Sequence, residues 1–223
     1  MSVKHELLAL AVGVIVVALC GLPVWARHRA AYHYCDPRMG DAVRPDIQAL
    51  NILKNRQSAP AANDIDRTVS LAAMLRPGDD RNRWDDHKVA QVVGYVADVK
   101  MGGVETVNCH ARSVHGRDTH INLALSAADA YNEVTHVIVE VTPRWRAAMA
   151  TKGVDWETDT LREKLLGRCV KVTGWLLFDA EHRRESQNTA DAGAEVWRAT
   201  AWEIHPITSI DILPSCAHSS LSK

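Results

Sequence analysis

The chain has 223 residues, of which 47% are hydrophobic and 24% are charged, as in an ordinary globular protein. Its 26 Lys and Arg residues face 27 Asp and Glu residues, which gives a formal net charge of -1. This balance excludes a general attraction to nucleic acid, so binding of that kind would need a local basic patch.

Residues 7–26 form an uncharged apolar segment, LLALAVGVIVVALCGLPVWA. At about 1.5 Å of rise per residue, a helix of this length crosses a bilayer. Trp25 lies at its end, where an interfacial aromatic residue is expected. We predict an N-terminal membrane anchor at residues 1–26. A cleaved signal peptide and a lipoprotein modified at Cys20 are the alternatives.

The side of the membrane on which the rest of the chain lies is predicted from two opposing signals. Three basic residues closely follow the segment and one precedes it, which favours a cytoplasmic C-terminal domain: Arg27, Arg29, Arg38 and Lys4. A span at the extreme N-terminus usually exports the domain that comes after it. Four later cysteines also fit disulfides in an oxidising compartment, with their pairing left open: Cys35, Cys109, Cys169 and Cys216. We therefore expect a periplasmic or otherwise extracytoplasmic domain.

Residues 27–87 are predicted to form a linker with small helical segments, because Pro, Asn, Asp and Arg are frequent there. Residues 46–55 favour one short helix. Residues 66–80 favour another, ended by Pro77 and Gly78. The composition suits a stalk, a docking segment or a small subdomain.

From Lys88 onward the chain is rich in valine and alternates as β-strands do. We predict a helix over residues 158–168, with Gly167 as its stop. It separates the third and fourth of five main strands, which we place at residues 88–103, 116–126, 135–144, 169–179 and 196–212. Residues 105–113 are a further short extended segment, and residues 214–223 form a C-terminal tail.

This order of elements over residues 88–213 resembles the OB fold, a five-stranded Greek-key β-barrel. The resemblance implies a mainly β domain, with a bend or close backbone approach at Gly174 inside a strand. Staphylococcal-nuclease-like proteins share the strand order. Their acidic DGDT turn is absent here, where the turn reads VKMGGVET, so their activity is not carried over.

Polar residues on the strand surfaces are the candidate catalytic or metal-binding groups. Residues two apart on a strand share a face, so Glu203 and His205 lie opposite Trp202 and Ile204, which we expect in the core. Imidazole and carboxylate groups are the donors that a divalent metal requires. The candidates on three strands are His120, Glu140, Glu203 and His205. An ordinary polar face is the alternative, because no HExxH or CxxC motif supports a metal.

Further residues are candidates for ligand binding. OB barrels bind single strands on exposed aromatic residues beside basic ones, and the loop before the last strand is a usual contact region. The candidates are Asp118, Asn122, Arg144, Trp175, His182, Arg183, Arg184, Asn188 and Trp197. Asp179 with His182 could close over a site on the barrel surface.

The function predicted from these features is a membrane-anchored OB-like binding module without catalysis, an accessory or assembly subunit that binds a protein partner or ligand. One alternative is a metal-dependent, nuclease-like hydrolase that uses the His/Glu cluster. Another is a single-stranded nucleic-acid binding protein. A Cys109–His110 nucleophile pair is excluded because adjacent strand residues point to opposite faces. The chain also lacks GxSxG, P-loop and GxGxxG motifs.

Overall fold

The structure, a computed structural model, describes residues 35–216. These residues belong to one compact unit that starts at Cys35. The predicted anchor at residues 7–26 and most of the C-terminal tail lie outside the described residues, so both stay predictions. Within residues 35–216, no helix combines the length and the apolar composition of a transmembrane span.

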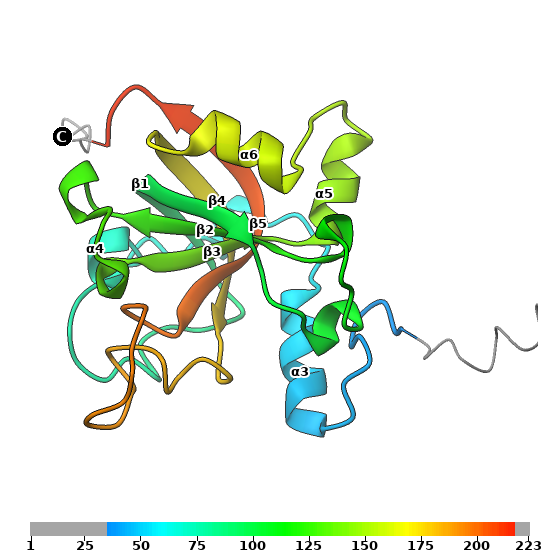
Figure 1. Cartoon of the computed structure of the whole chain (residues 1–223), viewed down its shortest axis with the longest axis horizontal. Coiled ribbons are helices and arrows are strands. Elements are labelled where there is room, and N and C mark those ends of the chain that lie inside the picture. Colours follow the sequence, from blue (N-terminus) through cyan, green and yellow to red (C-terminus); the bar gives the residue numbers. More distant parts are fainter. Residues whose placement is uncertain (1–34, 217–223) are drawn as a thin grey trace, which may run out of the picture. The chain divides into compact units, whose positions relative to one another are not determined.

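The domain is mainly β and contains a closed five-stranded barrel in the order β1-β2-β3-β5-β4 (Figure 1). The prediction of an OB-like barrel is confirmed at this level of pattern. Neighbouring strands are antiparallel except for β3 and β5, which run parallel and close the barrel. The strands are β1 Val89–Met101, β2 Thr119–Ala124, β3 Val137–Val141, β4 Cys169–Phe178 and β5 Trp202–Leu213.

Two helices lie between β3 and β4, of which the sequence predicts one. The predicted helix is α6, Thr158–Leu165, and its Leu161 and Leu165 pack into the barrel core. The helix that the sequence does not predict is α5, Pro143–Ala150. It follows β3 directly, because the Thr142 hydroxyl accepts the Trp145 N–H at 3.3 Å and Pro143 occupies the first turn.

The segment before the barrel contains α3, Pro45–Lys54, as the sequence predicts, and a much shorter α4 than predicted, Leu71–Met74. Ser70 caps α4, which delays its start, and Pro77 prevents a long continuation. The remaining helical segments are short 3-10 turns: η1 Ala62–Asp64, η2 Thr106–Asn108, η3 Val114–Gly116, η4 Ala127–Asp129 and η5 Glu133–Thr135.

Residues 105–113 do not form the predicted extended segment. They contain η2, and Cys109 and His110 have positive φ angles of 51° and 55°. The argument from opposite strand faces is therefore wrong for this pair. Cys109 is disulfide-bonded to Cys35, which leaves it no free thiol for nucleophilic attack.

The barrel core follows the predicted alternation along β5. Trp202 is 2% exposed and Ile204 is fully buried, and both belong to the central hydrophobic cluster. A close backbone approach explains Gly174, because a Cβ there would lie 2.4 Å from the Pro206 carbonyl oxygen at a register irregularity between β4 and β5. Leu125 is 44% exposed because β2 already ends at Ala124.

The segment from residue 35 to residue 87 packs against the barrel. Met74 of α4 is fully buried in the core, and Lys54 of α3 is 1% exposed. The Arg56 guanidinium donates to the Leu176 carbonyl of β4 at 2.7 Å. Two disulfides, Cys35–Cys109 and Cys169–Cys216, fasten the segment before α3 and the residues after β5.

Candidate functional site

Five ionisable side chains from β2, β3, β5 and the residue before β2 meet on the outer side of the barrel. Strand register brings His120 of β2 opposite Glu140 of β3, and the parallel pairing of β3 with β5 places Val139 beside Ile204. Side chains alternate along strands, so the residues flanking these core positions gather on the other face. We call the resulting group the buried polar cluster: Asp118, His120, Glu140, Glu203 and His205.

A chain of contacts links these residues. His120 Nε2 lies 3.1 Å from Glu140 Oε1, and His205 Nδ1 lies 3.5 Å from Glu140 Oε2. His205 Nδ1 also lies 3.3 Å from Glu203 Oε2. Glu140, Glu203 and His205 are 3%, 1% and 0% exposed, and His120 is 8% exposed. The structure therefore brings together the four residues that the sequence nominates and excludes water from all but the edge of the group.

Arg198 holds the far side of Glu203. Its Nη2 lies 2.7 Å from Glu203 Oε1, its Nε donates to the Thr200 carbonyl at 2.8 Å, and its guanidinium lies over the Trp197 ring. A buried carboxylate needs such a partner to remain charged. Trp197 donates its indole N–H to Glu185 Oε2 at 2.7 Å, so it supports Arg198 and does not join the cluster.

Asp118 lies just before β2 and is 2% exposed. Its Oδ2 accepts a hydrogen bond from Asn108 Nδ2 at 2.9 Å, whereas its Oδ1 has no hydrogen-bond partner among the described residues. Arg144 donates to Asn108 Oδ1 at 3.0 Å, so Arg144 reaches Asp118 only through Asn108. The sequence places Asp118 and Arg144 among the ligand-binding candidates but gives no sign of the Asn108 bridge.

The electrostatics of the cluster favour ion pairs. Burial alone would raise the pKa of Glu140, but His120 and His205 hold that pKa well below its usual range. Burial opposes the charged form of His205, yet Glu140 and Glu203 raise its pKa to about 9. Burial raises the pKa of Asp118 to about 6, opposed by the nearby His205. At neutral pH His205 is thus charged beside the charged Glu140.

A second buried ion-pair group adjoins α3. Lys54 Nζ lies 2.9 Å from both Asp179 Oδ2 and Glu105 Oε2, and His182 Nδ1 lies 3.3 Å from Asp179 Oδ2. Although burial disfavours the charge on Lys54, Asp179 and Glu105 raise its pKa well above its usual value. The sequence places Lys54 in a short helix of the predicted linker, and only the tertiary packing of α3 shows that this lysine is buried.

An open hollow of about 340 Å³ leads to the edge of the buried polar cluster. His120 lies in its lining with Lys100, Gly102, Arg117, Glu133 and Trp197. A Cβ at Gly102 would lie 2.8 Å from two atoms of the His120 ring, so the glycine makes room for that imidazole. The hollow thus reaches His120, the member of the cluster that contacts Glu140.

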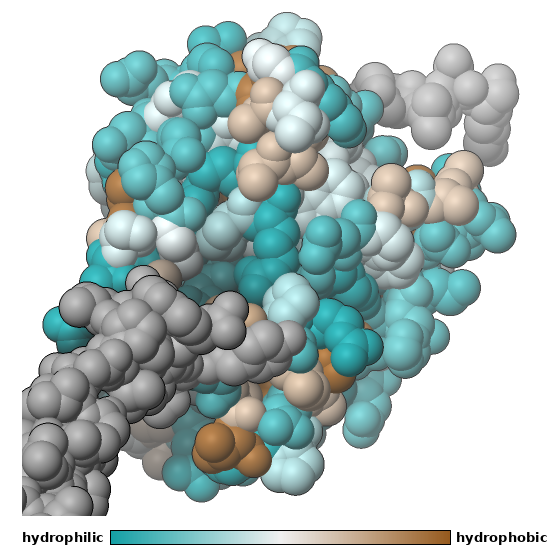
Figure 2. Space-filling model, turned by 90° about the vertical axis from the view of Figure 1, so that its right-hand side faces the viewer, coloured by the Kyte–Doolittle hydropathy of each residue, from teal (hydrophilic) through white to brown (hydrophobic). Residues whose placement is uncertain are grey.

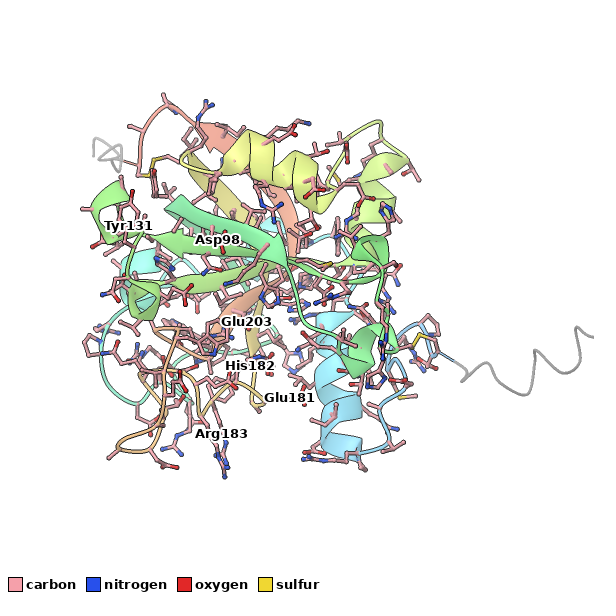
Figure 3. The ribbon with its side chains drawn as sticks, in the orientation of Figure 1. Asp98, Tyr131, Glu181, His182, Arg183 and Glu203 are labelled. Atoms are coloured by element: carbon pink, nitrogen blue, oxygen red, sulfur yellow. A yellow bond between two sulfur atoms is a disulfide. The ribbon has the colours of Figure 1, made fainter. Side chains whose placement is uncertain are left out.

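A larger hollow of about 750 Å³ lies over the connection between β4 and β5. We call it the arginine hollow, because its lining includes Arg44, Arg81, Arg183 and Arg184. An adjoining hollow of about 350 Å³ shares the last three and adds Asn188. In Figure 3 the labelled side chains Glu203, His182 and Arg183 follow one another from β5 outward to this connection.

Other predicted ligand-binding residues do not join one surface. Asn122 contacts the His136 ring at 3.4 Å, and Asn188 donates to the buried Asp80 at 2.7 Å. Trp175 donates to the Ser58 carbonyl at 3.0 Å and lies under the Arg56 guanidinium, on β4. Figure 2 shows a mostly hydrophilic face around α3 and α5, with hydrophobic residues in separate patches. The visible part of this face therefore offers mainly polar groups for contact.

Two groups within residues 35–216 have the composition of a cation site. One is buried: Asp118, Glu140 and His205 each offer a ligand atom, and these atoms lie within 4.8 Å of one another. The other joins Asp85, Asp86 and His87, consecutive residues on the surface. Comparison of the chain with protein-family models, with curated proteins and with solved structures finds no match.

Proposed function

We propose that the protein is a membrane-anchored OB-like binding module that holds an acidic segment of a protein partner in the arginine hollow. The observation that carries this proposal is the hollow itself, which gathers four guanidinium groups from three separate parts of the chain. A guanidinium pairs with a carboxylate through two parallel hydrogen bonds, which gives both affinity and direction.

The charges around the hollow leave two arginines available. Arg44 is paired with Asp46, and Arg81 is paired with Asp79. Arg183 and Arg184 are exposed, and no carboxylate of the described chain lies within ion-pair distance of either. Because these two guanidinium groups are adjacent in sequence, they can bind neighbouring acidic residues of one partner segment.

The dispersal of the aromatic residues favours a protein partner over a single-stranded nucleic acid. Trp202 is in the core, Trp175 lies against Ser58, and Trp197 supports Arg198. None of these three indole rings lines the arginine hollow, and its aromatic residue, Phe178, is half-buried and packed edge-on against Trp202. A stacking platform for bases needs exposed rings beside the basic groups, and the net charge of -1 offers no additional attraction.

The burial of the polar cluster favours binding over hydrolysis. A hydrolase must admit substrate to its reacting groups, whereas Glu140, Glu203 and His205 are at most 3% exposed. The group instead resembles a set of paired charges that fixes the positions of β2, β3 and β5.

The apolar segment at residues 7–26 supports attachment to a membrane. Two disulfides support a periplasmic or otherwise extracytoplasmic domain, because such bonds persist in oxidising compartments. An accessory subunit of a membrane-associated assembly fits both features.

The test is a binding titration of the full chain in mild detergent with a decaglutamate peptide and, separately, with decathymidylate. We expect saturable binding of the peptide that weakens as salt increases. The double variant Arg183→Ala/Arg184→Ala should lower the affinity roughly 10-fold or more. The matched control is Arg67→Ala/Arg112→Ala, which removes the same charge from exposed positions outside the hollow and should change the affinity little.

Two outcomes would contradict the proposal. Equal losses in both double variants would show that only overall charge matters. Tighter binding of decathymidylate than of the peptide would favour the single-stranded nucleic-acid alternative.

A further inference from the structure

Each of three residues in the buried polar cluster has one polar atom held by a neighbour and one polar atom without a hydrogen-bond partner, although Glu140 Oε2 lies 3.5 Å from His205 Nδ1. Asp118 Oδ2 accepts from Asn108, and Glu140 Oε1 lies 3.1 Å from His120 Nε2. His205 Nδ1 lies 3.3 Å from Glu203 Oε2. The atoms left without a hydrogen-bond partner in the described chain are Asp118 Oδ1, Glu140 Oε2 and His205 Nε2.

Unpartnered polar atoms are unfavourable in a buried position, because each loses its hydration without a replacement. Asp118, Glu140 and His205 are 2%, 3% and 0% exposed. Ligand atoms of the same three residues lie within 4.8 Å of one another. Ligand atoms of a tetrahedral site with bonds of about 2.0–2.1 Å lie about 3.4 Å apart, so side-chain movements of roughly 1 Å close the group around an ion.

We infer that Asp118, Glu140 and His205 form a binding site for one divalent transition-metal ion. One imidazole nitrogen with two carboxylate oxygens is a donor set suited to Zn²⁺ or Mn²⁺, and binding of the ion displaces the proton from the ligating nitrogen of His205 to solvent. The three ligands come from β3, β5 and the residue before β2, so the ion ties three strands of the barrel together.

The neighbours of these residues have the arrangement that supports metal ligands. A ligating histidine commonly gives its second ring nitrogen to a carboxylate, which orients the ring, and Glu203 occupies that position beside His205 Nδ1. Asn108 orients Asp118, and His120 orients Glu140. His120, which contacts Glu140, also lines the open hollow of about 340 Å³, so the cluster borders on an open space at the surface.

The second candidate cation site, at the surface, lacks the burial and the unpartnered polar atoms of the first. Asp85, Asp86 and His87 are consecutive surface residues, and Asp85 Oδ1 already accepts the His87 N–H at 2.8 Å. It has no buried unpartnered atom in the part of the chain that the structure describes. It therefore serves as the natural control for metal held at the surface.

The test is a metal titration of the full chain, purified with a chelator and then dialysed against Zn²⁺ or Mn²⁺. We expect about one equivalent per chain by elemental analysis, and a melting temperature that rises on loading and falls on chelation. The control variant His87→Gln should retain both the metal and the thermal shift.

Substitution of the ligands should remove the ion. Asp118→Asn, Glu140→Gln and His205→Gln keep the size of each side chain, and each should lower the metal affinity roughly 100-fold or more. Circular dichroism establishes which variants fold. Full metal content in any folded ligand variant would overturn the inference, as would loss of the metal in His87→Gln.

If none of the three ligand variants folds, the melting temperatures of the wild type and of His87→Gln test the inference. Thermal shifts shared by the wild type and His87→Gln would then support a metal held in the buried polar cluster. A melting temperature that responds to neither metal nor chelator would overturn the inference.

Discussion

Lys54 Nζ lies 2.9 Å from Asp179 Oδ2, and each of the two side chains is 1% exposed. Lys54 ends α3, in the segment that precedes the barrel, whereas Asp179 directly follows β4. The ion pair therefore fastens the first part of the described chain to the connection that carries Arg183 and Arg184. A buried lysine is tolerated because two carboxylates, Asp179 and Glu105, contact its ammonium group.

Removing this lysine should destabilise the fold. Lys54→Met leaves Asp179 buried with one partner fewer, and we expect a loss of about 3–5 kcal/mol in the free energy of unfolding. Urea denaturation measures the change. The matched control is Lys171→Met, because the Lys171–Asp211 pair has side chains 36% and 54% exposed and should contribute less than about 1 kcal/mol. Equal effects of the two substitutions would contradict the buried role of Lys54.

Stability should depend on pH through His182. Burial lowers its pKa, but Asp179 raises it to about 9. Because the folded pKa lies above the unfolded value, the stabilisation is fully present below about pH 6.5 and is lost as the pH rises through about 9. His182→Gln should therefore cost about 1–2 kcal/mol at pH 6, with a smaller difference from wild type at pH 9.5. A difference that stays constant or grows with pH would contradict this account.

Gly102 should be required for the position of His120. A Cβ at residue 102 would lie 2.8 Å from His120 Cδ2 and Nε2, so Gly102→Ala should displace the ring from Glu140 and cost about 1–3 kcal/mol. Gly103→Ala is the matched control, since the nearest atom to its Cβ is Glu105 Oε1 at 3.6 Å. Thermal denaturation and the imidazole NMR signal of His120 measure the effect. An unshifted signal in Gly102→Ala would show that the ring tolerates the methyl group.

The Cys35–Cys109 disulfide should contribute strongly to stability. It closes a loop with a sequence separation of 74, and a loop of that length predicts a contribution of about 4 kcal/mol. Cys35→Ser/Cys109→Ser should lower the free energy of unfolding by about that amount, as measured with guanidinium. A loss under about 1 kcal/mol would contradict this. It would indicate that non-covalent contacts, such as the Lys54 ion pairs, hold residues 35–87 against the barrel without the disulfide.

Local patterns predict most of the barrel. Alternation along residues 196–212 places Trp202 and Ile204 in the core and Glu203 and His205 opposite them, because side chains alternate with a period of two. The stop at Gly167 likewise predicts the end of α6 near Leu165. The sequence does not predict α5, since Pro143 is as compatible with the end of a strand as with the first turn of a helix.

The contacts within the site depend on tertiary pairing that no local pattern contains. The sequence names His120, Glu140, Glu203 and His205 as one set, and the parallel pairing of β3 with β5 brings them together. Their chemical role stays a prediction. The sequence does not predict that Lys54 and Asn108 contact these buried groups. A lysine at the end of a short helix and an asparagine in a loop are ordinarily solvated.

The measurement that tests the binding account most directly is photo-crosslinking in intact cells, with a photoreactive residue at position 180 or at position 131. Ala180 is exposed and lines the arginine hollow beside the two binding arginines, whereas Tyr131 is 97% exposed and lies away from Arg183 in Figure 3. We predict a discrete adduct in the membrane fraction from position 180 only, lost when Arg183→Ala is added. No adduct from position 180, or the same adduct from both positions, would contradict the arginine hollow as the partner-binding surface.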